Sequence, residues 1–153
     1  MPESFNYTQL GGVRLMIPEL GVDIPVLGVP FDGETGWDVT WLGNSAGFLE
    51  GTALPTQTGN TFLTAHVYDS FGRPGPFVDL NSLGWGDLVI LEAEGKTYTY
   101  QVVNKLIVSP NDTSVLWHDN YDRLTLLTCY LYDEASDSYQ YRVVIQTILV
   151  SVE

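Results

Sequence analysis

The chain has 153 residues, of which 44% are hydrophobic and only 16% charged, the balance of one folded domain and not of a disordered or coiled-coil protein. Its 6 basic and 19 acidic residues give a net charge of −13, which repels phosphate backbones, so nucleic-acid binding is not expected. No segment approaches the roughly 18–20 apolar residues of a membrane span, and charges at Glu3, Arg14 and Glu19 argue against a secretory signal.

The apolar segments are short, rich in Val, Ile, Thr and Tyr, and separated by Gly, Pro, Asn and Asp, which is typical of strands joined by turns. The pattern predicts strands over Val13–Ile17, Phe62–Val67, Asp87–Glu92, Lys96–Val103, Lys105–Val108, Leu124–Cys129 and Tyr141–Val152. So many strands suit a mainly β domain, either a closed barrel or a sandwich.

Two connections in this pattern have features of their own. Residues 31–59 hold several glycines and aromatic residues without a clean period, which predicts a long ordered connection with room for a helical turn. After Pro74-Gly75-Pro76, apolar residues recur three apart and predict one short helical turn packed on the sheet: Phe77, Leu80 and Leu83.

Cys129 is the only cysteine, which excludes an internal disulfide and a site with several thiolate ligands. An isolated cysteine in a β-rich chain is ordinarily core filling. This one, however, ends a predicted strand beside a loop, where an accessible nucleophile is commonly placed. The thiol is therefore either core filling or a nucleophile.

Two further residues stand at strand ends. His66 closes its strand, and an imidazole there can protonate a leaving amine if the fold brings it near Cys129. Alone, such a histidine is more often structural. Arg142 begins the apolar run Val143-Val144-Ile145, and a guanidinium entering a strand requires a partner or a function.

These residues carry a resemblance to a known family. The run Thr125-Leu126-Leu127-Thr128-Cys129 matches the TLxTC signature of sortases, and Tyr141-Arg142 follows at the family's usual distance. Residues 59–66 resemble the family's histidine strand, and Gly84-Trp85-Gly86-Asp87 resembles its Gly-Asp strand entry. Each motif alone is weak, but the combination, from about Ile24 to Val152, is specific. Ala65 stands where many sortases carry glycine, which leaves the subfamily open. The chain resembles classes D and E.

The resemblance implies a single closed sortase-type β-barrel of about eight strands with one or two short helices. Residues 1–23 would form an N-terminal segment and the first strand, and residues 24–153 the catalytic barrel, one domain overall. It also implies a cysteine transpeptidase with Cys129 as nucleophile, His66 as general acid/base and Arg142 stabilising the oxyanion or the substrate. The substrates would be proteins with an LPxTG-like C-terminal signal, and the acceptor an amine of a cell-wall peptide or of a pilin lysine.

The stretch Lys105 to Tyr121 is the expected wall of the substrate groove. Trp117 and His118 within it, together with Thr128, are the candidate substrate-binding residues, although His118 is first a surface residue and a tryptophan in a β fold more often packs. No cofactor is expected. Three acidic residues after Cys129 offer oxygen ligands for calcium, but their spacing does not match a recognised calcium loop: Asp133, Glu134 and Asp137.

The family resemblance places the chain at the extracellular face of a bacterial membrane, as the soluble domain of a protein that meets the membrane only through an anchor absent from this chain. The alternative is a non-catalytic extracellular β-barrel that serves binding or assembly. In that case Cys129 is inert filling and Arg142 belongs to a structural ion pair.

Overall fold

The computed structural model describes residues 7–32, 36–37, 42–50, 52, 60–68, 73–108, 123–129 and 142–153. The strands within these ranges are β1 (Thr8–Ile17), β2 (Val22–Val29), β3 (Phe31–Asp32), β4 (Gly36–Trp37), β5 (Ala46–Leu49), β6 (Asn60–His66), β7 (Leu88–Ala93), β8 (Lys96–Val108), β9 (Arg123–Cys129) and β10 (Arg142–Val152). Two 3₁₀ helices, η1 (Pro18–Leu20) and η2 (Leu80–Ser82), accompany them.

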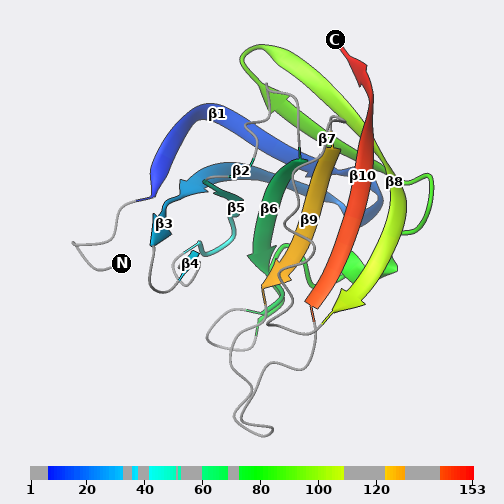
Figure 1. Ribbon diagram of the computed structural model, residues 1–153, viewed down its shortest axis with the longest axis horizontal. Helices are drawn as coiled ribbons and strands as arrows, with labels where there is room; N and C mark the ends of the chain where they lie inside the picture. The colour runs from blue at the N-terminus through cyan, green and yellow to red at the C-terminus, as the bar shows by residue number, and fades with distance from the viewer. Residues whose placement is uncertain are drawn as a thin grey trace, which may run out of the picture.

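Within the described ranges, eight strands close into a barrel in the order β1-β2-β5-β6-β9-β10-β8-β7, and β7 pairs with β1 to complete it. The pairs β2–β5 and β6–β9 are parallel, and the other pairs of the barrel are antiparallel. Figure 1 shows β6, β9 and β10 side by side. The predicted mainly β barrel of about eight strands with one or two short helices is thus confirmed, and its first strand, β1, is part of the closed sheet.

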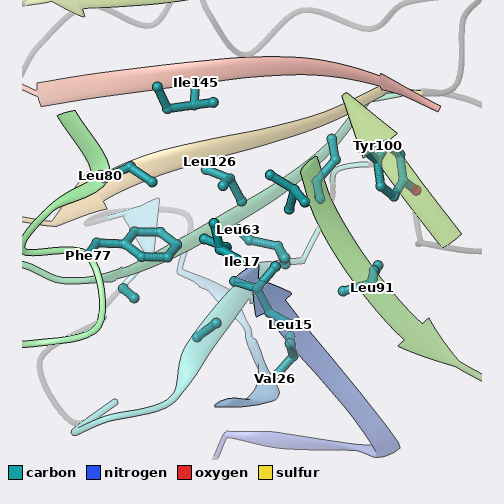
Figure 2. Packing of buried hydrophobic residues seen from close by; sticks show 14 of the residues in the cluster. Leu15, Ile17, Val26, Leu63, Phe77, Leu80, Leu91, Tyr100, Leu126 and Ile145 are labelled. Atoms are coloured by element: carbon teal, nitrogen blue, oxygen red, sulfur yellow. The ribbon is translucent and has the colours of Figure 1, made fainter. Parts of the chain in front are cut away.

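The barrel interior is filled by alternate residues of the strands. Leu63 and Ala65 of β6, Leu126 of β9 and Ile145 of β10 belong to one cluster of buried side chains, as the side-chain period of two requires. Figure 2 shows this cluster, with Leu15, Ile17 and Leu91 contributed from other strands. Burying this apolar surface is the main force that holds the barrel together.

The predicted helical turn after the Pro-Gly-Pro segment is confirmed as η2. Phe77, Leu80 and Leu83 are all at most 1% exposed and belong to the interior cluster. Figure 2 shows Phe77 and Leu80 at one side of this cluster, so the turn packs its apolar side chains into the barrel interior.

Two strand assignments differ from the sequence pattern. The expected break between Val103 and Lys105 is a β-bulge inside one strand, β8, because Gln146 pairs with Asn104 while Thr147 pairs with Val102. The strand β2 was missed because Pro25 interrupts its pattern. Pro25 pairs with Arg14 of β1 on one side of the strand, and the pairing of β2 with β5 on the other side begins one residue later, at Val26.

The connection expected over residues 31–59 also contains strand structure in its described parts. Ala46–Leu49 forms β5, whose residues are all buried between β2 and β6. A fully buried strand lacks the alternation of polar and apolar residues, so the period of two gave no signal. Neither described helix is long or apolar enough to cross a bilayer.

Candidate active site

The candidate histidine and the candidate nucleophile occupy neighbouring positions on parallel strands. In the register of β6 with β9, the Cα of His66 is paired with the Cα of Cys129, and each residue is the last of its strand. Adjacent strands of a sheet lie about 4.8 Å apart. Two residues separated by 63 positions in the chain are therefore direct neighbours.

Arg142 lies on the third strand of the same group. It is the first residue of β10, which runs antiparallel to β9 with Val144 opposite Leu127 and Ile145 opposite Leu126. Continuing this register by two residues sets Arg142 opposite Cys129. The ends of β6 and β9 and the beginning of β10 meet at the lower edge of the barrel in Figure 1, so the backbone brings all three positions together.

The three positions also belong to the same face of the sheet. Phe62, Leu127 and Val144 form, with Val29, Leu42 and Leu49, a second cluster of buried residues, here called the outer cluster. Its members alternate along β6, β9 and β10 with residues of the interior cluster, so it covers the outside of the barrel. His66, position 129 and Arg142 follow the same alternation, so these backbone positions belong to the outer face of the sheet, beside the outer cluster.

Buried hydroxyl groups join β6 to β9 along the length of the pair. The Thr64 hydroxyl of β6 donates to the backbone oxygen of Leu127 on β9 at 2.7 Å. Toward the other end of the β6–β9 strand pair, the Thr125 hydroxyl of β9 donates to Oδ1 of Asn60 on β6 at 2.8 Å. These contacts fix the register between β6 and β9, and thereby the pairing of their last residues. The sequence pattern assigns no role to Thr64, although a polar residue within an otherwise apolar strand is a signal for such a contact, and Thr125 stands there only as part of the TLxTC run.

Thr128, a candidate substrate-binding residue, is 1% exposed. Its hydroxyl accepts the backbone N–H of Val143 at 2.8 Å and lies 3.4 Å from the Val143 carbonyl oxygen. Strand alternation sets Thr128 in step with the interior residue Leu126, opposite the face of position 129. The structure thus shows an interstrand contact for this hydroxyl, and its substrate-binding role stays a prediction.

The surroundings of His66 and Arg142 differ. His66 is 3% exposed, and its backbone oxygen accepts the N–H of Phe77 at 3.0 Å. Arg142 is partly exposed, and no carboxylate in the described part of the chain forms an ion pair with its guanidinium. Arg142 thus places a positive charge next to the last residue of β9.

Several expectations fall on residues outside those the structure describes. Trp117 and His118 belong to this group, as do Asp133, Glu134 and Asp137. Among the described residues, no group of three or more His, Cys, Asp or Glu side chains is close enough to hold a metal ion.

Comparison with known proteins assigns the family. Residues 15–150 match the sortase domain model. This match covers most of the chain, including both strands of the His66–Cys129 pair and the start of β10. The chain therefore belongs to the sortase family.

Individual relatives agree with this assignment. The chain is 29% identical over 124 residues to sortase D of Bacillus subtilis (strain 168), a match that covers 80% of this chain and 55% of that protein, so the chain spans about half of this relative. Sortase A from Corynebacterium diphtheriae superimposes with a TM-score of 0.74 at 27% identity, covering 93% of this chain and 61% of that one. Sortase C-1 from Actinomyces oris gives a TM-score of 0.72 at 29% identity, covering 91% and 73%.

Proposed function

We propose that this chain is the catalytic domain of a transpeptidase that cleaves an LPxTG-like C-terminal sorting signal and transfers the acyl group to an amine. The observation that carries the proposal is the strand register, which sets His66 beside Cys129 and continues to Arg142 on the other side. Membership of the sortase family supports the same chemistry.

In the first half-reaction, the Cys129 sulfur attacks the scissile carbonyl carbon as a thiolate, forming an S–C bond while the carbonyl electrons move to oxygen. Arg142 donates hydrogen bonds to that oxyanion or holds the substrate carbonyl. When the oxyanion collapses, the C–N bond breaks and His66, as imidazolium, gives its proton to the departing amine. A thioester on Cys129 remains.

In the second half-reaction, an incoming amine attacks the thioester carbonyl carbon and passes its proton to the His66 imidazole. The C–S bond breaks, the thiolate is restored, and a new amide bond has replaced the old one. The two steps balance without a metal, an oxidant or a cofactor. Water as the nucleophile instead gives slow hydrolysis.

The proposed acceptor is an amine of a cell-wall peptide or of a pilin lysine, and the proposed setting is the outer face of a bacterial membrane. The proposed substrate contacts are Trp117, His118 and Thr128. A protein with a net charge of −13 gains no attraction from anionic wall polymers, so its placement there depends on tethering and not on its surface field.

The test uses the fact that Cys129 is the only cysteine in the sequence. The protein is incubated with a library of LPxTG-like peptides, and its intact mass is recorded with and without an added amine peptide. We expect one thioacyl adduct per chain, lost in Cys129→Ala, and its conversion to a ligated peptide when a glycine or lysine amine is supplied. The acceptor that gives ligation distinguishes the wall-anchoring reaction from pilin polymerisation.

The non-catalytic binding module predicts a different result. In that case no adduct forms with any peptide, and iodoacetamide alkylates Cys129 only after denaturation. Rapid alkylation of the folded protein that is slowed in His66→Ala would instead support the nucleophile. Absence of both the adduct and this His66-dependent reactivity rejects the proposed function.

A further inference from the structure

The segment after β6 returns to lie against the end of that strand. The backbone N–H of Gly75 donates to the oxygen of Val67 at 2.7 Å, and the N–H of Phe77 donates to the oxygen of His66 at 3.0 Å. Tyr68 and Pro74 form an antiparallel bridge at the same place. The backbone of His66 is thus paired with β9 and also hydrogen-bonded to this returning segment.

Glycine at position 75 is required by the closeness of this contact. A Cβ added to Gly75 would lie 2.4 Å from the carbonyl oxygen of His66, 2.9 Å from its carbonyl carbon and 3.2 Å from its Cβ. The first two of these atoms are backbone, which cannot rotate away as a flexible side chain can. Any larger residue at position 75 must therefore move either its own segment or the backbone of His66.

The returning segment is poorly able to move. Pro74 and Pro76 fix their own φ angles and restrict the residues before them to extended conformations, Gly75 among them. Phe77, which follows directly, is 1% exposed and anchored in the interior cluster. The displacement caused by a larger residue is therefore expected to fall on His66, the last residue of β6.

We infer that Gly75 is a positioning residue for the reaction: it allows the Pro-Gly-Pro segment to press directly on the His66 backbone and hold the imidazole in register with Cys129. This inference rests on the proposed function, because Gly75 can affect the reaction in this way only if His66 is the proton donor and Cys129 the nucleophile. Misplacement of a reacting group by about 1 Å costs on the order of 100-fold in rate.

The experiment compares Gly75→Ala with Gly84→Ala in the whole chain. Gly84 is a matched control because an added Cβ meets nothing within 4 Å and its φ lies outside the positive region. For each protein we would measure Tm, the kcat and KM of peptide ligation, and the pH dependence of iodoacetamide alkylation at Cys129. Gly75→Ala is expected to lower kcat by about 10- to 100-fold, to leave KM within about threefold, and to change the pH profile of alkylation. Gly84→Ala should match the parent protein.

A double variant separates positioning from a general loss of stability. Pro76→Ala added to Gly75→Ala frees the segment to retreat from His66, so it should restore part of kcat even where Tm falls further. Loss of activity without a change in the alkylation profile, and without rescue by Pro76→Ala, would overturn the inference. If Gly75→Ala does not fold, Pro76→Ala alone carries the test: a changed alkylation profile supports the inference, and an unchanged profile with unchanged kcat overturns it.

Failure of this inference is distinguishable from failure of the proposed function. A parent protein that forms no thioacyl adduct rejects the proposed reaction itself. A parent protein that forms the adduct and ligates peptide, together with a Gly75→Ala protein that is folded and equally active, rejects only the role of Gly75.

Discussion

Replacing Thr128 with valine removes a buried hydroxyl while keeping the size and branching of the side chain. The N–H of Val143, which this hydroxyl accepts at 2.8 Å, is then left without that acceptor in the barrel wall. A buried donor that loses its partner costs about 1–3 kcal/mol, which corresponds to a fall in Tm of roughly 2–12 °C for a domain of this size. Thr128→Ser keeps the hydroxyl and gives up one methyl group, so it should lose only about 0.8 kcal/mol.

The same change should affect the reaction, because Thr128 precedes Cys129 and Val143 follows Arg142. With their last cross-link removed, the ends of β9 and β10 can separate, and kcat should fall by about 10-fold or more. Thr147→Val is the matched control: its buried hydroxyl donates to the Leu124 oxygen at 2.7 Å between the same two strands, far from Cys129. That variant should lose about 0.5–1.5 kcal/mol and keep the parent kcat.

Thermal unfolding followed by circular dichroism, together with steady-state ligation kinetics, checks both parts. If Thr128 instead contacts substrate, Thr128→Val will raise KM for the peptide and leave Tm unchanged. Unchanged Tm and unchanged kinetics would refute the reasoning altogether, since the hydroxyl of a buried residue, bonded across two strands, would then contribute to neither stability nor activity.

Two further predictions concern charge at the site. Arg142→Lys replaces a planar fork of donors with a single ammonium and should lower kcat/KM by about 100-fold or more. Arg14→Lys is the control, because Arg14 makes an exposed ion pair with the Asp23 carboxylate at 2.9 Å and a hydrogen bond to the Asp23 backbone oxygen at 3.3 Å. It should leave kcat/KM unchanged and shift stability by less than about 1 kcal/mol, and equal activities of the two variants would remove Arg142 from the mechanism. The pH profile of kcat/KM should be bell-shaped, because attack needs Cys129 as thiolate while proton donation needs His66 as imidazolium, and a profile that is flat from about pH 6 to about pH 9 would contradict this pairing.

Local patterns in the sequence were sufficient for most strands of the barrel, but they missed β2 and β5 and could not give the neighbours of any strand. Short runs of apolar and β-prone residues between turn residues predicted strands over Phe62–Val67 and Leu124–Cys129, and the structure has β6 and β9 within one or two residues of those bounds. Their parallel pairing joins segments with β7 and β8 between them in the chain, and no period of two encodes such a partner.

The contact at Gly75 was hidden from sequence reasoning for a different reason. Pro74-Gly75-Pro76 looks like an ordinary turn, and glycine in a turn usually supplies a positive φ. Here the φ of Gly75 lies outside that region, and what requires glycine is the carbonyl oxygen of His66, nine positions earlier in the chain. Only the packing of the two segments shows it.

The TLxTC run can now be explained residue by residue. Thr125 bonds to Asn60 on β6, Leu126 fills the barrel interior, Leu127 joins the outer cluster, and Thr128 bonds to Val143 on β10. Each of the first four positions is therefore fixed by a contact within the barrel, and together they hold the backbone of Cys129 between two neighbouring strands. The motif consequently constrains the backbone at the position of the nucleophile through contacts with both neighbouring strands.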